Sequence, residues 1–415
     1  MDRLGRSLRR SPRFFRLLVA LRLIRVLDRP ALRRYAKRHG RIWPLPAPPT
    51  DVDEEPLRGP IRPALPAGEG LNVSEPYPWS LDPGFVCELR DVSLLGHKPI
   101  VATADGRYVL DSLAPTRSNH VKLEDTFRRL TARHGLAALR SGFTGAHRVP
   151  PGARHIPHAC LLTDGLQHSY YHWVLEQLTK LRAVDEYRRH TGETPTLVLP
   201  YARTRWMLEL IDLVGYGDAE TFHWSGPRNG RVDRLVLPSY PVPTPASCGW
   251  LRERVLGDEE AAPEERRERI LIARGDGYDW WRRAVVNQDE LEAALEPLGF
   301  RSYRLAEMSV LEQARLFDRA EAIVGVHGAG FTNMVFSRGA AVLELFGRQV
   351  RPHYFRLAHV VGLPYRYLLC EPVSAEEVAA HAPSHDADPV RGVDPGLRVD
   401  VTALTRALAE MGIGP

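Results

Sequence analysis

The sequence lacks the motifs that most readily disclose a function. Its 415 residues include only four cysteines, and no two of them form a C-x-x-C pair. This scarcity excludes a disulfide framework or a zinc ribbon and fits a reducing cytosol. The P-loop pattern G-x-x-x-x-G-K-[ST] is absent, and no G-x-G-x-x-G turn follows the first strand. P-loop hydrolases are therefore excluded, and dinucleotide enzymes are disfavoured.

Long uninterrupted apolar runs are also missing. The apolar stretch from Phe14 to Leu27 is broken by three arginines, and no small-residue cleavage site follows it, so it suits neither a membrane span nor a secretory signal. Residues 1–41 carry fourteen Arg and Lys against two acids, a balance of +12, which leaves −7 for the remainder of a chain whose formal net charge is +5. A basic tail on an acidic body disfavours a specific nucleic-acid partner.

The basic tail over residues 1–41 admits two interpretations. Several cations near an anionic bilayer contribute about 1 kcal/mol each, so peripheral contact with a membrane is one of them. The other is a solvated or partly packed helix, since the arginines do not gather on one helical face. We expect a cytoplasmic protein that is peripheral on the inner face of the membrane if the first interpretation holds.

Length and composition predict two domains with extensions, because a single core stops growing beyond about 250–300 residues. The expected parts are a basic helical N-terminal extension (1–42), a Pro-rich linker (43–70), a β-rich segment leading into the first domain (71–150), a first Rossmann-like domain (151–250), a second Rossmann-like domain (265–375), and a C-terminal tail and helix (376–415). Strands alternate with helices in both large parts, which predicts an α/β fold with doubly wound parallel sheets.

The sharpest expected strand end lies within AIVGVHGAGFTNMVF, residues 322–336. The strand is expected to end at His327, and Gly328 and Gly330, on either side of Ala329, permit a tight turn close to a ligand. The helix that follows would direct its free N–H groups and positive dipole end at a phosphate. The Thr332 and Asn333 side chains, together with the imidazole, would add hydrogen bonds. The alternative is a tight turn whose glycines serve packing alone.

Polar side chains from neighbouring strands are expected at the same edge of the sheet. Arg274 closes the strand RILIAR, and Arg282 and Arg283 follow it; arginine suits phosphate oxygens. Glu344 lies within the strand AAVLELF, where an acid needs a partner. It would accept from ribose hydroxyls or form a salt bridge to Arg274 or Arg348. Together these residues predict a nucleotide pocket.

The segment HSYYHWVLE places His168, His172 and Glu176 at successive spacings of four. If Asp164 caps the helix, all three lie on one face, as a zinc site requires. If Ser169 is the cap, the first histidine lies outside the helix and that face is lost. No H-E-x-x-H motif supports the metal interpretation.

Four segments stand out together: DGLQHSYYHWVLEQLTKL, ILIARGDGYDWWRRAVVNQDEL, GVHGAGFTNMVF and VLELFGRQVRPHYFRLAHVVGLPYRYL. They resemble glycosyltransferase family 61, whose bacterial members are often labelled capsular polysaccharide biosynthesis proteins. The resemblance implies a GT-B fold, in which two Rossmann-like domains face a cleft and the second holds the nucleotide-sugar. It also implies inverting, metal-independent transfer, typically of N-acetylglucosamine, xylose or arabinose from a UDP donor to a glycan or other hydroxyl acceptor.

The resemblance points to His172 as the catalytic base, because it matches the family's central histidine. An inverting transfer needs a base for the acceptor hydroxyl, and imidazole titrates near the working pH. Glu176 would orient the other ring nitrogen or act as the base itself, with Asp164 and His168 next in line. The alternative is a buried structural histidine.

No metal or other cofactor is expected, and the nucleotide-sugar is a substrate. Asp51-x-Asp53 and Asp386-x-Asp388 are not at strand ends, unlike the cation-binding pair of metal-dependent transferases. The diphosphate charge would then be met by Arg274, one of the two following arginines, His327 and the helix start after Gly330. Two rival functions remain, a metallohydrolase that uses the histidine segment and a nucleotide-sugar binding module without catalysis.

Overall fold

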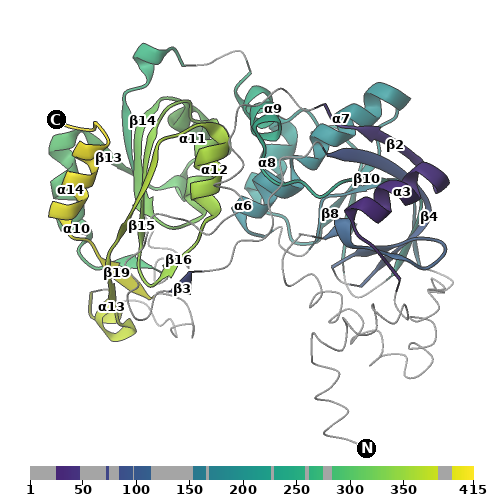
Figure 1. Cartoon of the computed structure of the whole chain (residues 1–415), viewed down its shortest axis with the longest axis horizontal. Helices are drawn as coiled ribbons and strands as arrows, with labels where there is room; N and C mark the ends of the chain where they lie inside the picture. Colours follow the sequence, from purple (N-terminus) through teal and green to yellow (C-terminus); the bar gives the residue numbers. More distant parts are fainter. Residues whose placement is uncertain are drawn as a thin grey trace, which may run out of the picture. The chain divides into compact units, whose positions relative to one another are not determined.

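The chain forms two compact units (Figure 1), each with its own sheets and helices. The computed structural model describes residues 25–46, 72–73, 84–96, 98–113, 153–164, 168–225, 229–257, 261–273, 283–381 and 395–415. Unit 1 comprises Met1–Pro48 and Leu81–Val242, and unit 2 comprises Pro49–Ser80 and Pro243–Pro415. Both combine helices with strands, which confirms the expected α/β class. The division falls at Val242, eight residues before the expected end of the first domain.

Unit 1 is built on a mixed nine-stranded sheet in the order β1-β6-β5-β4-β10-β7-β8-β9, with β2 paired to β4. The strands β10, β7, β8 and β9 run parallel to one another, whereas β4 pairs antiparallel with β10, β5 and β2. The strands are β1 (Val26–Leu27), β2 (Arg41–Pro44), β4 (Phe85–Leu95), β5 (Ile100–Ala102), β6 (Tyr108–Val109), β7 (Arg154–Leu161), β8 (Thr196–Pro200), β9 (Thr221–Trp224) and β10 (Gly230–Pro238). The unit is therefore Rossmann-like in its parallel half only.

The described end of the expected N-terminal extension is part of unit 1. Helix α3 (Arg29–His39) begins at the N-cap Asp28, whose carboxylate accepts from the Ala31 N–H. Its apolar residues Leu32 and Ala36 are fully buried against β4 and β10. Residues 25–46 thus contribute a helix and two strands to the sheet, whereas residues 1–24 lie outside the described part of the chain.

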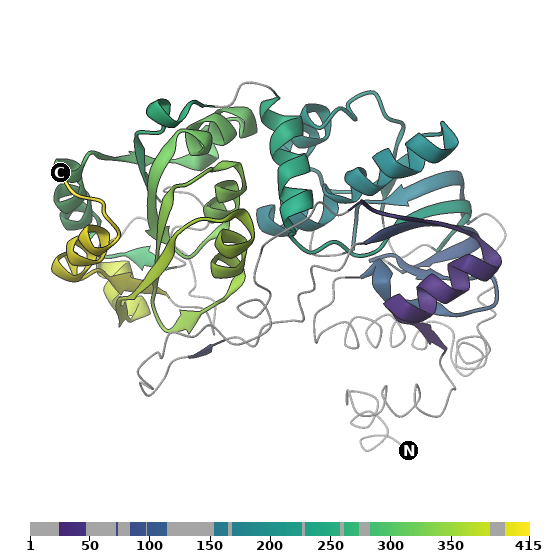
Figure 2. The ribbon, with the colours of Figure 1, turned by 45° about the horizontal axis from the view of Figure 1, so that its top comes forward.

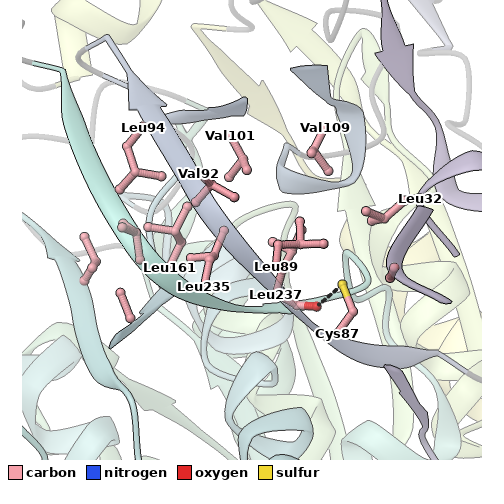
Figure 3. Packing of buried hydrophobic residues seen from close by; sticks show 14 of the residues in the cluster. Leu32, Cys87, Leu89, Val92, Leu94, Val101, Val109, Leu161, Leu235 and Leu237 are labelled. Carbon is pink, nitrogen blue, oxygen red and sulfur yellow. Dashed lines mark hydrogen bonds between the residues drawn. The ribbon is translucent and has the colours of Figure 1, made fainter. Parts of the chain in front are cut away.

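The core of unit 1 lies between α3 and one face of the sheet (Figure 3). Cys87, Leu89, Leu235 and Leu237 point to this face, because alternate residues of a strand share a side. The opposite face is covered by α7 (Lys180–Thr191), whose Tyr187 donates to Glu88 over 2.8 Å. All four cysteines are free and buried, as the sequence predicts. Burial raises the pKa of the Cys160 thiol to about 12, so this thiol is not a nucleophile at neutral pH.

Unit 2 contains a five-stranded, wholly parallel sheet in the order β13-β11-β14-β15-β17. Its strands are β11 (Glu268–Ile272), β13 (Phe300–Tyr303), β14 (Ala320–Val326), β15 (Ala341–Phe346) and β17 (Tyr365–Leu369). Three of them, β11, β14 and β15, correspond to strands expected from the sequence, and their ends differ from the expected ones by one or two residues. The spatial order, written in chain order as 2-1-3-4-5, is one of the two common doubly wound arrangements.

Helices cover both faces of this sheet (Figure 2). On one face lie α10 (Gln288–Leu295) and α14 (Val401–Glu410), whose leucines join the strand residues in one core. On the other face lie α11 (Val310–Asp318), α12 (His353–Val361) and α9 (Pro245–Leu256). Helix α11 begins with a capping box between Ser309 and Glu312. The expected C-terminal tail is thus partly structural, since α14 completes a face of unit 2.

Two small sheets complete unit 2. One joins β12 (Ala284–Val285), β19 (Gly396–Arg398) and β18 (Glu371–Val373), and the other pairs β3 (Asn72–Val73) with β16 (Gln349–Val350). Among the residues that the structure describes, no helix is both long and apolar enough to cross a lipid bilayer.

Candidate functional site

The parallel strands of unit 1 have a reversal point where a ligand is expected to bind. Counted along the chain, β9-β8-β7-β10 are the third, second, first and fourth of these strands, so the order reverses between β7 and β10. Ligands of open α/β sheets bind at the carboxyl ends of the two strands at such a point. Cys160 pairs with Val236 there. Four residues further on, Asp164 and Tyr240 lie at the same level.

Tyr240 stands at the centre of a buried hydrogen-bond network. Its hydroxyl oxygen lies 2.8 Å from Asp164 Oδ2, 2.7 Å from Glu176 Oε2 and 3.2 Å from Gln177 Nε2. Burial, and after it the two carboxylates, raises the pKa of Tyr240 far above its ordinary value. The side chain therefore remains a neutral phenol at any working pH.

The helix after β7 begins later than a metal-binding face requires. Helix α6 (Tyr170–His172) has Ser169 as its N-cap, and His168 precedes it as an exposed residue. The helix continues as a π-helical turn, η2 (Trp173–Gln177), in which the Leu178 N–H bonds to the Trp173 carbonyl. Such turns occur often at functional sites. The structure therefore separates His168 from the other two members of the HSYYHWVLE pattern.

His172 and Glu176 form a dyad at the mouth of this network. His172 Nδ1 lies 2.8 Å from Glu176 Oε2, and their side chains are 20% and 2% exposed, respectively. Only the imidazole is therefore accessible to a substrate, and the carboxylate can act on the substrate only through it.

Lys180 places a positive charge beneath the dyad, and the sequence analysis did not identify it. Its ammonium is buried and donates to the Leu161 carbonyl over 3.1 Å and to Gln177 Oε1 over 2.7 Å. Burial lowers the pKa of Lys180, and Asp164 is the largest opposing influence. Lys180 follows Glu176 by four residues, as Glu176 follows His172, and this spacing was the signal in the sequence from which Lys180 could have been identified.

The described residues contain one group of three metal-ligating side chains, formed by Glu88, His158 and Glu193. It lies at β4, β7 and the end of α7, away from the carboxyl edge of the sheet. The Arg234 guanidinium contacts Glu193 and lies 3.9 Å from Glu88. This guanidinium already supplies the positive charge between the two carboxylates. Among the described residues, His168, His172 and Glu176 form no such group.

Unit 2 has its own reversal point, between β11 and β14. His327 follows β14, and its N–H still bonds to the Leu345 carbonyl in the sheet. The 3₁₀ helix η6 (Ala329–Phe336) begins two residues later, one residue earlier than expected from the sequence. Ala329 is exposed and Gly328 and Gly330 are partly exposed, so the first N–H groups of η6 face outward with no partner inside the helix. Arg274 and Arg282 lie outside the described residues.

Glu344 fixes the orientation of His327 from beneath. Glu344 Oε1 lies 2.5 Å from His327 Nδ1, and the Tyr365 hydroxyl donates to Oε2 over 2.5 Å. The carboxyl is fully buried and burial raises its pKa to about 8. A protonated Glu344 donates to Nδ1 and leaves the hydrogen on Nε2 of His327, whose side chain is 8% exposed. Glu344 does not pair with Arg348 and is too buried to meet a ribose.

Arg283 also supports this turn from the backbone side. Its Nη1 donates to the His327 carbonyl over 2.9 Å, and its own backbone is left-handed, with φ of 60°. Thr332 and Asn333 are fully covered by protein, and the Asn333 amide donates to Gln313 Oε1 over 2.7 Å. A Cβ on Gly330 would lie 2.9 Å from Leu305 and 3.0 Å from Ile272. Packing thus contributes to the glycine requirement.

The Glu344→Gln variant should become more stable than the native protein as the pH rises. The folded-state pKa of Glu344 is raised to about 8 from 4.5, so its protonated form stabilises the fold below the unfolded pKa, and this contribution is lost as the pH rises toward 8. The loss is at most about 1.4 kcal/mol per pH unit. Urea unfolding at pH 5 and pH 8 measures the free energy of unfolding of both proteins. A difference between them that does not change with pH would contradict the prediction.

Residues 170–343 match the family model described as Glycosyltransferase 61. The match confirms the resemblance over a segment that runs from the start of α6 into β15. The EGF domain-specific O-linked N-acetylglucosamine transferase of Mus musculus is 31% identical over 117 residues, which are 26% of this chain and 21% of that protein. The protein of that name from Bos taurus is 32% identical over 101 residues, 23% of this chain and 18% of the relative. The chain thus matches about a fifth of the length of these curated relatives.

Proposed function

We propose that this chain, which matches glycosyltransferase family 61 over residues 170–343, is an inverting glycosyltransferase. It would move a sugar from a nucleoside diphosphate donor, UDP-linked by the family resemblance, to a hydroxyl group of a glycan or other acceptor. The observation that carries the proposal is the His172–Glu176 dyad at the carboxyl edge of unit 1, because only its imidazole is accessible. Relatives that share part of the sequence are named as N-acetylglucosamine transferases.

His172 acts as the base in this proposal. Glu176 accepts the hydrogen of Nδ1, which leaves the lone pair of Nε2 for the acceptor hydroxyl. As the hydroxyl oxygen attacks the anomeric carbon, its proton passes to Nε2, and the bond from that carbon to the diphosphate oxygen breaks. The Glu176 carboxylate stabilises the imidazolium that forms. Attack from the face opposite the leaving group inverts the anomeric centre.

The leaving diphosphate is held in unit 2 without a metal ion in this proposal. His327 Nε2–H and the outward N–H groups of Ala329 and Gly330 supply donors, and the start of η6 adds its dipole. Arg274 follows β11 in the sequence and would add a full charge. The GT-B arrangement belongs to the proposal as well, since each unit carries a site at the carboxyl edge of its parallel strands.

The Arg274→Ala variant should bind uridine diphosphate about ten- to one-hundredfold more weakly, since a hydrogen bond to a charged group contributes about 1.5–3 kcal/mol. Calorimetry with uridine diphosphate measures the affinity, and circular dichroism checks the fold. Arg301→Ala is a matched control, because Arg301 is an exposed arginine on the adjacent strand β13. Equal affinity in the native protein and the Arg274 variant would remove this residue from the diphosphate site.

A screen of nucleotide sugars tests the proposed reaction. The purified chain is incubated with each donor, with and without chelator, and both transfer and slow donor hydrolysis are followed. Turnover that survives chelation supports metal-independent transfer. Binding of uridine diphosphate with no turnover of any donor would favour the non-catalytic binding module. Stoichiometric zinc that is lost in His172→Ala would instead favour the metallohydrolase.

The cellular role extends the same proposal. The family resemblance favours cell-surface polysaccharide synthesis, and residues 1–24 add positive charge that would hold the enzyme at an anionic membrane surface. Sedimentation with vesicles of anionic and of neutral lipid, using the full chain, tests the membrane contact. Equal sedimentation with both kinds of vesicle would exclude it.

A further inference from the structure

The Tyr240 hydroxyl has more hydrogen-bond partners than its single proton can satisfy. Two carboxylate oxygens, from Asp164 and Glu176, lie 2.8 and 2.7 Å from it. The Gln177 amide donates to the same oxygen. A phenol has one proton to donate and can accept two hydrogen bonds. Both short oxygen–oxygen contacts are hydrogen bonds only if one of the two carboxyl groups carries a proton of its own.

The charges around Tyr240 also fit one proton on the pair. Asp164 and Glu176 are 0% and 1% exposed, and two adjacent buried carboxylates repel each other. Lys180 is the buried cation beside them, and its ammonium lies 5.2 Å from the centre of the Tyr240 ring. Asp111 is already paired with Arg29, whose guanidinium also donates to the Tyr240 carbonyl. One shared proton leaves a single negative charge opposite Lys180.

We propose that Tyr240 is a positioning residue through which Asp164 and Glu176 share one proton beneath His172. The inference rests on the proposed function in giving His172 the role of base. One carboxyl group donates to the phenol, and the phenol donates to the other carboxylate. A transfer of the proton from the first carboxyl group to the phenol oxygen, coupled to transfer of the phenol proton to the second, would exchange the two charges. The number of protons is conserved throughout.

Infrared spectroscopy tests the shared proton without any need for activity. The difference spectrum of native protein minus Asp164→Asn at neutral pH should contain the carbonyl stretch of one protonated carboxyl. The other buried acids, Glu344 and Asp111 among them, are present in both proteins and cancel. Absence of that band would overturn the proposal.

The pH profile of kcat/KM provides a second test, on the Tyr240→Phe variant. Loss of the phenol removes a hydrogen-bond donor that stabilises the negative charge of the carboxyl pair beside His172, so the acid limb of the profile should move to higher pH. Tyr216→Phe is the matched control, because the buried Tyr216 donates to Asp185 over 2.8 Å in the same unit. It should lose stability without any change in the pH profile. An unshifted limb in Tyr240→Phe, or an equal shift in the control, would overturn the positioning role.

The two tests separate the inference from the proposed function. An infrared band without transferase activity would support the shared proton and contradict only the proposed reaction. Transferase activity without the infrared band would support the proposed reaction and contradict the shared proton.

Discussion

Replacement of His172 by alanine is expected to lower kcat by about 10²- to 10⁴-fold, the usual contribution of a general base. The imidazole is the part of the buried network that substrate can reach, and Glu176 is too covered to replace it. Affinity for uridine diphosphate should change little, because the proposed diphosphate site lies in the other unit. Steady-state transfer assays measure kcat, and calorimetry measures the nucleotide affinity.

Two further variants sharpen the His172 experiment. Glu176→Gln should also lower kcat. It should move the acid limb of the pH profile of kcat/KM to lower pH, because an imidazolium beside a neutral amide is less stable than one beside a carboxylate. His39→Ala is the control, since His39 is an exposed histidine at the end of α3. Full activity of the His172→Ala variant would show that another group acts as the base.

Much of the fold could be predicted because its signals are local. The capping box at Ser309 and the stop of α7 at Gly192, which has a positive φ of 73°, depend on neighbouring residues alone. Local signals also have limits. Asn287 is of a residue type that favours the N-cap and stands at the N-cap of α10, yet its amide bonds to the Val399 backbone, 112 residues away, and does not cap the helix. That contact depends on α14 and β19, which follow much later in the chain.

The candidate site was predictable in part for the same reason. His172 and Glu176 lie one turn apart, so their spacing discloses the contact. Tyr240 is 76 residues from Asp164, and only the parallel pairing of β7 with β10 brings them together. No local pattern marks the tyrosine that follows VLPS. The choice between Asp164 and Ser169 as the helix cap also required the structure, since both residue types are good caps.

The largest expected loss of stability comes from Lys180→Met. The ammonium is buried and donates two hydrogen bonds, so methionine fills a similar volume but leaves the charge of the Asp164–Glu176 pair without its cation. Removal of one partner from a buried ionic group costs about 3–5 kcal/mol. Urea unfolding measures it against Lys37→Met, an exposed lysine of α3 whose loss should change stability by less than about 0.5 kcal/mol.

The pH dependence of the Lys180→Met deficit identifies its cause. Without the cation, the buried charge of the carboxyl pair is more costly in the folded state, and protonation of the pair removes that cost as the pH falls. The variant should therefore approach the native protein in stability at acidic pH and fall behind it at neutral pH. A deficit of equal size at both would indicate a packing defect and would count against Lys180 as the counter-charge of the site.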